Sequence, residues 1–171
     1  RSPMLIDADG LNALARQPDT LLEAAGPRVL TPHPGEMARI TGMKVSQVLE
    51  AREQVAAAFA GRYSCTLVLK GHNTLVVGPE PGRGLRGPFI NTTGNSGLAS
   101  GGTGDVLSGL IGGLMAQGMG PLDAALLGVY VHGLAGDLAA AAKTQRAMIA
   151  SDVINALPDA WRLLEQDTPA P

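Results

Sequence analysis

Residues 91–105 read NTTGNSGLASGGTGD, and residues 106–117 continue with apolar positions at the spacing typical of a helix. Five glycines fall between Gly94 and Gly104. Main chain without side chains can approach an anion closely, and the free N–H groups at a helix start carry about half a positive charge. The segment therefore predicts a phosphate-binding loop at the start of a helix.

Asp105 is the residue that makes this loop more than an anion site. A carboxylate in the first turn of the helix would repel a bound phosphate at rest, whereas a carboxylate that accepts a hydroxyl proton would serve a phosphoryl transfer. The alternative is that Asp105 simply caps a helix after a flexible loop. Other glycine-rich motifs do not match, because a P-loop needs Lys where Asp105 stands and the dinucleotide motif follows a first strand.

Upstream of the loop, the pattern predicts alternating strands and helices. We expect strands at residues 4–9 and 28–31 with a helix over 11–25 between them, which is typical of a parallel sheet. A helix started by Ser46 should run to residue 60, and residues 66–69 and 74–77 should form a hairpin at a sheet edge. Residues 78–88, rich in Gly and Pro, predict a surface loop.

Downstream, the pattern predicts helices over residues 105–117 and 122–143 and a last helix from Ser151 that Pro158 bends or splits. Gly118 should end the first of these helices, and the tail after residue 165 should fray. Glycines inside a helix are unfavourable, so those at positions 109, 112 and 113 indicate close packing against a neighbour.

Two further segments follow predicted strands, where open parallel sheets bind ligands. The sequence TPHPGE at 31–36 offers His33 as a ligand contact, although a rigid turn in which Glu36 starts a helix explains it as well. Asp7, Asp9 and Asn12 could contact phosphate-bound Mg²⁺ through water, but capping by Asp9 is an equal alternative.

The remaining polar positions give weaker signals. The turn KGHNT at 70–74 offers one cation and main-chain amides to a nucleotide, although turns favour such residues on steric grounds. His132 and Asp137 lie in an apolar helix and are expected to be core polar residues rather than ligands. Since the histidines lie on separate elements without metal-ligand spacing, we predict no zinc site.

Composition limits the function classes. A chain of 171 residues fits one domain or most of one, and a net charge of −2 leaves no basic face for nucleic acid. Cys65 is the single cysteine, which rules out an intrachain disulfide and suits a reducing cytoplasm. Polar residues interrupt each apolar run before it reaches the length of a membrane span, so no membrane association is expected.

Four motifs together resemble one known family. The stretches DADGLNAL at 7–14, TPHPGE at 31–36, LKG at 69–71 with Asn73 and Thr74, and NTTGNSGLASGGTGDVLSG at 91–109 occur in this order in the ADP- or ATP-dependent NAD(P)H-hydrate dehydratases. These enzymes belong to the ribokinase-like superfamily. The resemblance runs from Leu5 to about Pro158, and HPGE distinguishes the dehydratases from kinases of the superfamily.

The resemblance implies a fold and a reaction. The fold is an α/β three-layer sandwich with a mostly parallel central sheet, of which residues 1–171 would be the C-terminal part of a single domain, without the family's N-terminal strands. The reaction is the dehydration of (S)-hydrated NADH or NADPH, in which the ring hydroxyl is phosphorylated at the expense of ADP or ATP with Mg²⁺ and phosphate is then eliminated. Homo-oligomers and an associated epimerase domain are further expectations.

The resemblance also assigns roles to single residues. Asp105 matches the catalytic acidic residue at the substrate hydroxyl, and His33 matches a contact to the hydrated dinucleotide. The nucleotide contacts match Lys70, Gly71, His72, Asn73, Thr74 and Gly104, and the anion hole matches Gly101, Gly102, Thr103 and Gly104.

Two other functions remain open at the level of sequence. One is a small-molecule kinase of the same superfamily, of the hydroxymethylpyrimidine or thiazole kinase type, which would release a phosphorylated product. The other is a catalytically inactive nucleotide-binding module, which would bind ADP without turnover.

Overall fold

The computed structural model describes residues 2–167 and contains a five-stranded sheet in the order β1-β2-β3-β4-β5. The strands are β1 (Met4–Ile6), β2 (Arg28–Leu30), β3 (Thr66–Leu69), β4 (Leu75–Glu80) and β5 (Gly84–Ile90). β1, β2 and β3 pair in parallel, whereas β4 and β5 each pair antiparallel to the preceding strand. The predicted parallel start and the hairpin of β3 and β4 are confirmed.

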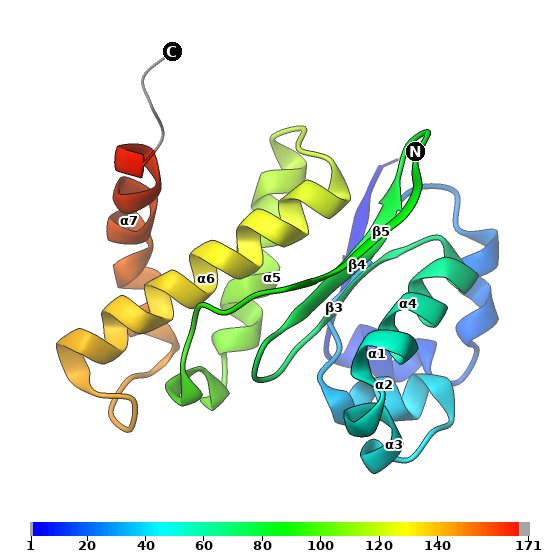
Figure 1. The fold of residues 1–171 in the computed structure, drawn as a ribbon, viewed down its shortest axis with the longest axis horizontal. Helices are drawn as coiled ribbons and strands as arrows, with labels where there is room; N and C mark the ends of the chain where they lie inside the picture. The colour runs from blue at the N-terminus through cyan, green and yellow to red at the C-terminus, as the bar shows by residue number, and fades with distance from the viewer. Residues whose placement is uncertain (1, 168–171) are drawn as a thin grey trace.

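Residues of alternating orientation give the sheet two buried faces. Leu30, Leu67 and Leu69 pack on one side into a core that includes Met37 and Phe59. Val29, Val68 and Val76 pack on the other side against the helices that follow the glycine-rich loop. Because both faces are covered, β3 is buried at all four positions. The predicted three-layer α/β sandwich is confirmed, and Figure 1 shows one helical layer on each side of the sheet.

The first helical layer differs from the predicted one in its boundaries. It contains α1 (Asp9–Leu14), α2 (Pro34–Thr41), α3 (Val45–Glu50) and α4 (Arg52–Tyr63), with a 3₁₀ segment at Pro18–Glu23. The predicted helix over 11–25 is wrong, since Pro18 lacks the N–H that would continue α1. The predicted helix from Ser46 to residue 60 occurs as two helices: α3 starts at Val45, and the chain breaks at Ala51 (φ −128°, ψ 40°) before α4.

The Gly- and Pro-rich segment 78–88 is not a loop. It forms the end of β4 and most of β5, and only the residues between these two strands form a turn. The edge strand of the sheet is therefore β5 and not β4. Gly78 and Gly87 stand where a neighbouring strand comes close: a Cβ at Gly78 would lie 2.6 Å from Thr66 Oγ1 and 3.0 Å from Thr66 Cα, and a Cβ at Gly87 would lie 2.7 Å from the Val76 carbonyl oxygen. Two of the glycines that suggested a loop are therefore needed for strand pairing.

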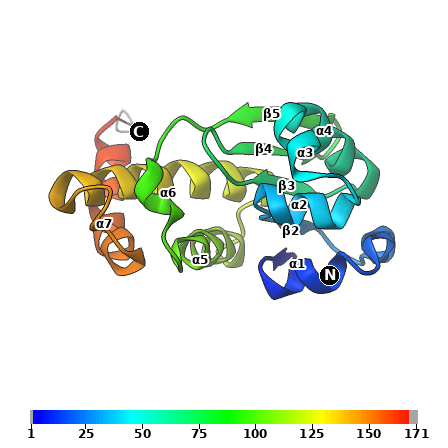
Figure 2. The same ribbon diagram turned by 90° about the horizontal axis from the view of Figure 1, so that it is seen from below.

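The second helical layer consists of α5 (Thr103–Ala116) and α6 (Pro121–Lys143), against which α7 (Ala150–Asp167) packs. Figure 2 shows α5 and α6 together on one side of the strands, with α7 at the far end of α6. α7 runs through Pro158 without splitting, starts one residue before the predicted Ser151 and ends at Asp167; the rest of the predicted frayed tail lies outside the described residues.

Glycine packing occurs on α6 rather than on α5. In the described part of the chain, nothing lies within 4 Å of a Cβ built at Gly109, Gly112 or Gly113, so the predicted close packing of these residues is wrong. The close approaches are made by glycines of α6. At Gly128, for example, a Cβ would lie 2.5 Å from Cγ1 of Ile111 on α5.

Two sequence features are settled by burial. Cys65 is buried, and burial raises the pKa of its thiol to about 12, so the thiol is protonated and unreactive at neutral pH.

α6 is long and apolar enough to span a membrane by length and composition alone, although polar residues interrupt its apolar sequence and no span was expected. However, 56% of its most apolar window is buried inside the fold, as in the core helix of a globular domain.

The contact of Gly128 with Ile111 gives a test of this packing. We expect Gly128→Ala to lower the free energy of unfolding by about 1–3 kcal/mol, because the buried Ile111 side chain has no room to move away. The control is Gly61→Ala in α4, where a Cβ meets its nearest atom at 3.9 Å. This variant should gain up to about 1 kcal/mol from helix propensity. Urea unfolding measures both, and equal effects would contradict the packing described.

Candidate active site

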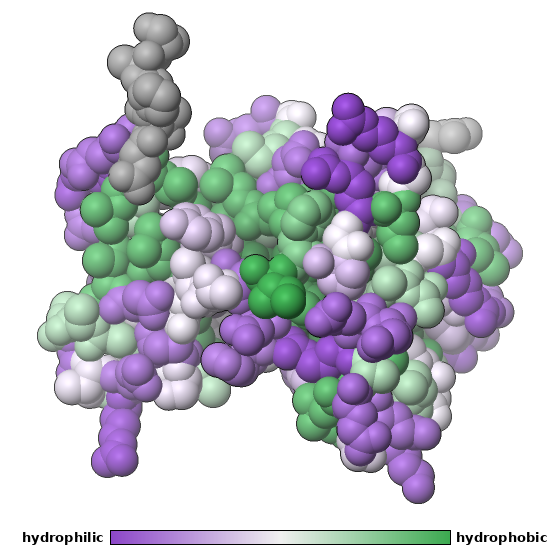
Figure 3. All heavy atoms as spheres, in the orientation of Figure 1, coloured by the Kyte–Doolittle hydropathy of each residue, from purple (hydrophilic) through white to green (hydrophobic). Residues whose placement is uncertain are grey.

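A cavity of about 750 Å³ lies where the glycine-rich loop, the turn after β3 and the start of α5 meet. This volume is in the range that small-molecule ligands and cofactors occupy. Its lining comprises residues 33–34, 70–74, 91–96, 98–99, 103–104, 107, 129 and 132–133. Figure 3 shows hydrophilic residues around the indentation between the loop and this turn. The structure thus brings segments from four separate parts of the chain to one cavity.

The predicted site residues fall into two groups around this cavity. His33, the turn 70–74, Thr103 and Gly104 line it, as the site predictions require. Gly101, Gly102 and Asp105 are exposed and flank the lining residues at the start of α5. Asp105 is therefore accessible to a ligand, and its place in the first turn of the helix is confirmed.

The start of α5 is open to an anion. Gly102 occupies the position before the helix in the left-handed region (φ +86°), and no side chain in the described part of the chain caps the first turn. Thr103 is buried and donates its hydroxyl to the carbonyls of Leu98 (2.6 Å) and Ser100 (2.9 Å), which anchors the loop. Uncapped main-chain N–H groups therefore remain at a fixed helix start, as anion binding requires.

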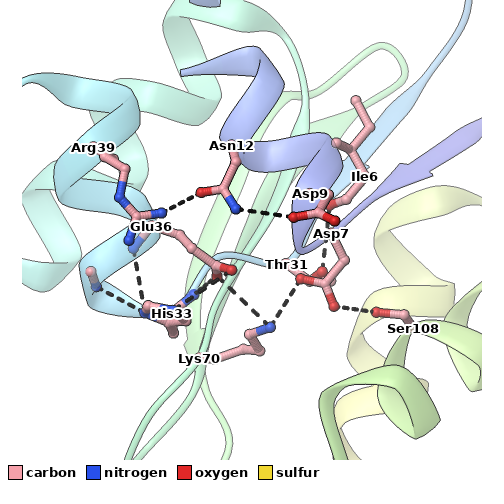
Figure 4. A network of polar contacts seen from close by, with 11 residues as sticks. Ile6, Asp7, Asp9, Asn12, Thr31, His33, Glu36, Arg39, Lys70 and Ser108 are labelled. Carbon is pink, nitrogen blue, oxygen red and sulfur yellow. Dashed lines mark hydrogen bonds and ion pairs between the residues drawn. The ribbon is translucent and has the colours of Figure 1, made fainter. Parts of the chain in front are cut away.

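Lys70 brings a positive charge to the same place, as Figure 4 shows. Its ammonium group lies 3.0 Å from Asp7 Oδ1 and 4.0 Å from Glu36 Oε2, and Ser108 on α5 donates to Asp7 Oδ2 at 2.7 Å. A Cβ built on Gly104 would lie 3.5 Å from Lys70 Nζ. The ammonium group therefore stands directly against the start of α5.

His33 serves the helix that follows it and also faces the cavity. Its Nδ1 accepts hydrogen bonds from the N–H groups of Gly35 (3.0 Å) and Glu36 (3.3 Å), and Glu36 Oε2 accepts from His33 N–H at 2.8 Å. This reciprocal cap starts α2 at Pro34, not at Glu36. The His33 side chain is 53% exposed, and its Nε2 lies 3.6 Å from Glu36 Oε1. The interpretation of TPHPGE as a rigid turn that starts a helix is therefore confirmed, and the ligand contact by His33 stays a prediction.

Asp7, Asp9 and Asn12 have protein partners instead of the open oxygens that a resident Mg²⁺ ion needs. Protein donors bind both oxygens of Asp7, and Asn12 bridges Asp9 (3.4 Å) and Arg39. Among residues 2–167, no group of three or more His, Cys, Asp or Glu side chains gathers around one point. These residues do not fit a resident ion. Contact of Asp7, Asp9 and Asn12 through water with Mg²⁺ carried on nucleotide phosphates stays a prediction.

α6 contributes residues to the site that the sequence analysis placed outside it. Asp137 accepts from Gly94 N–H (2.8 Å) and from the Asn95 side chain (2.9 Å), and this fixes the glycine-rich loop. His132 is buried as predicted, but it also lines the cavity, and its Nε2 lies 2.9 Å from the Thr103 carbonyl. Burial lowers the pKa of His132, so the ring is neutral at pH 7 and Nε2 donates the bond.

A signal for this role was present in the sequence. His132, Gly133, Gly136 and Asp137 recur at the spacing of one helix face. On this face a Cβ at Gly133 would lie 2.1 Å from Thr93 Oγ1, and one at Gly136 would lie 2.8 Å from Leu98. Small and polar residues on one face of an apolar helix therefore mark where the loop packs.

The ion pair of Asp7 predicts a dependence of stability on pH. Burial opposes ionisation of Asp7, but the hydrogen bonds from Ser108 and Lys70 and the Lys70 charge outweigh it and lower its pKa below the ordinary value of about 3.9. The carboxylate therefore stabilises the fold fully above about pH 4, and this contribution is lost as pH falls through the lowered pKa.

We expect Asp7→Asn to lower the free energy of unfolding at pH 7 by about 1–3 kcal/mol, since it removes charge-assisted hydrogen bonds. The variant should also lose less stability than the unchanged protein between about pH 4 and pH 2. Denaturant unfolding across this range measures both effects. The exposed Asp123→Asn on α6 is the control, and if its acid profile matched that of Asp7→Asn, the ion pair would not be the cause.

Comparison with known proteins gives relatives along nearly the whole chain. The sequence pattern of a family described as NAD(P)H-hydrate dehydratase matches residues 1–159. The bifunctional NAD(P)H-hydrate repair enzyme Nnr of Moorella thermoacetica is 47% identical over 165 residues, which are 96% of this chain and 30% of that protein.

Solved structures are also similar to this chain. The ADP/ATP-dependent NAD(P)H-hydrate dehydratase from Bacillus subtilis, co-crystallized with ATP and Mg²⁺, matches with a TM-score of 0.77 at 32% identity, over 94% of this chain and 55% of that one. A ribokinase-like superfamily protein from Enterococcus faecalis matches with a TM-score of 0.70 at 31% identity, over 93% and 52%. The chain spans about half the length of these two proteins and less of the Moorella protein.

These matches confirm the ribokinase-like fold that the motifs predicted. The family pattern includes the site segments at 7–12, 31–36, 69–74 and 91–109, all of which lie within residues 1–159. The chain belongs to the NAD(P)H-hydrate dehydratase family.

Proposed function

We propose that the protein restores hydrated NADH or NADPH by an ADP- or ATP-dependent dehydration. The observation that carries this proposal is the meeting of three groups at the start of α5: uncapped main-chain amides, the Lys70 ammonium group and the accessible Asp105 carboxylate. Relatives at 47% and 35% identity are named as repair enzymes or dehydratases of NAD(P)H hydrate, which supports the same reaction.

In the proposed reaction, the turn 70–74 binds the adenine nucleotide and His33 contacts the hydrated dinucleotide. Asp105 accepts the proton of the ring hydroxyl as the hydroxyl oxygen attacks the terminal phosphorus of the nucleotide. The bond from that phosphorus to the bridging oxygen breaks at the same time, and AMP (from ADP) or ADP (from ATP) leaves with its electron pair. The amides of residues 101–104 and Lys70 stabilise the charge on the transferred phosphoryl group. The carbon–oxygen bond then breaks, phosphate leaves with the electron pair, and loss of a proton from the adjacent carbon restores the dihydropyridine ring.

Cofactors and partners follow from the same proposal. Mg²⁺ bound to the nucleotide phosphates would neutralise part of their charge, as in other phosphoryl transfers. The name "bifunctional" of the Moorella relative supports a second repair activity beside this one, which we propose is an epimerase acting on the same hydrate. We also propose a cytoplasmic location and a homo-oligomer.

The assignment of Asp105 gives the main test. We expect Asp105→Asn to lower kcat for dehydration by about 10²–10⁴-fold, because the amide cannot accept the hydroxyl proton. Binding of ADP should remain, since the main-chain amides of the first turn are unchanged. Recovery of reduced-nicotinamide absorbance from the hydrate measures kcat, and calorimetry measures ADP binding.

The matched control is Asp123→Asn, because Asp123 is also an exposed acid in the first turn of a helix, α6, and lies outside the cavity lining. It should keep the activity of the unchanged protein. Full activity in Asp105→Asn would remove the proposed base, and a phosphorylated product that accumulates without loss of water would favour the kinase alternative.

A further inference from the structure

Arg52, the first residue of α4, holds the turn that follows β3. Its half-buried guanidinium group donates from Nη1 to the His72 carbonyl at 2.6 Å. From Nη2 it donates to the carbonyls of Leu69 at 3.3 Å and Asn73 at 3.2 Å. One side chain therefore binds three carbonyl oxygens of a single turn.

The shape of the turn requires such a donor group. Gly71 (φ +142°) and Asn73 (φ +55°) both adopt positive φ, and carbonyls from the start, middle and end of the turn converge on α4. Converging carbonyl oxygens repel one another unless donors lie between them. The planar fork of arginine supplies several donors in a fixed geometry, whereas the single ammonium group of lysine cannot reach all three oxygens together.

Arg52 acts from behind the binding surface. Residues 70–74 line the cavity, while Arg52 lies on the α4 side of the turn and is not part of the lining. A Cβ at Gly71 would lie 3.4 Å from Nη2, which is an ordinary van der Waals distance, so the guanidinium group lies next to the turn at this residue. Arg52 therefore lies against the turn at Gly71 as well as binding it through the hydrogen bonds.

The charge of Arg52 adds to this role. Its hydrogen-bond partners are neutral carbonyls, so the positive charge beneath the turn is not cancelled by a carboxylate within the described chain. Burial lowers the pKa of Arg52, but an arginine remains protonated at neutral pH. A positive charge under one side of a turn favours an anionic ligand on the other side.

We propose that Arg52 is a positioning residue for the adenine nucleotide, which it serves by fixing the 70–74 turn in its binding shape. The inference rests on the proposed function, because the turn is assigned to the nucleotide there. It adds a residue of α4 that the site motifs do not include.

The test compares ADP binding in four proteins made from the full reading frame: the unchanged protein, Arg52→Met, Arg52→Lys and Arg62→Met. Arg62 is the matched control, because it lies on the same helix and bonds Asp19 far from the cavity lining. In calorimetric titrations, Arg52→Met should weaken ADP binding at least tenfold and Arg52→Lys by less, while Arg62→Met should bind as the unchanged protein does. The KM for the hydrated dinucleotide should stay within twofold in all four.

A second measurement separates positioning from a purely structural role. Hydrogen exchange should become faster at the amides of residues 70–74 in Arg52→Met and remain unchanged there in Arg62→Met. If Arg52→Met is less stable but its folded form binds ADP with unchanged affinity, the inference is overturned. If the unchanged protein binds no ADP, the proposed function is contradicted. This outcome differs from the one that overturns the inference about Arg52, in which the unchanged protein and Arg52→Met bind ADP equally well.

Discussion

The site depends on the ion pair between Lys70 and Asp7, because it joins segments that are far apart in the sequence. Asp7 follows β1, Lys70 follows β3, and Ser108 on α5 completes the contact. The Lys70 and Asp7 side chains are only 21% and 11% exposed, so each charge needs its partner. With Glu36 on its other side, the Lys70 ammonium group is held in one place, and this fixes its position against the start of α5.

The acidic residues around the cavity differ in whether their carboxylates accept hydrogen bonds from the protein. Protein donors bind the carboxylates of Asp7, Glu36 and Asp137. Within the described residues, no protein donor bonds the exposed carboxylate of Asp105. A carboxylate whose oxygens already accept hydrogen bonds from the protein holds the fold together, whereas one without protein donors is open to a hydroxyl group of a ligand. The division supports the proposed role of Asp105 on grounds that are independent of the motif.

The sequence predicted most of the architecture and the centre of the site, and its errors have identifiable causes. α5 was found because its apolar residues keep helical spacing, α6 because it is a long apolar segment, and β1, β2 and β3 because they are short apolar runs followed by turn or polar residues. β5 was missed because glycines needed for close strand pairing look like loop residues. The chain breaks at Ala51, next to Arg52, and Arg52 contacts a turn about 20 residues away, a contact that local propensity does not contain.

Because sequence patterns are local, the residues that line the cavity were predicted better than the residues that hold those segments in place. Lys70, His33 and Gly104 belong to local motifs, each of which can be read in a few residues. Asp137 and Arg52 act through main-chain groups of segments that lie 43 and about 20 residues away, so only the folded chain shows what they bind. All three partners of Arg52 and the Gly94 partner of Asp137 are main-chain atoms, which carry no sequence signature of their own.

In the proposed function, these supports favour nucleotide binding because they fix the site before a ligand arrives. Asp137, His132 and the glycines of α6 hold the loop from Gly94 to Thr103, and Arg52 holds the turn opposite it. Loops rich in glycine lose much conformational entropy when they become ordered, and a ligand that had to order them would bind more weakly. Since protein contacts already fix both segments, the amides and the ammonium group face the cavity in a set arrangement. Such preorganisation is the condition under which fixed dipoles stabilise a charge that develops during a reaction.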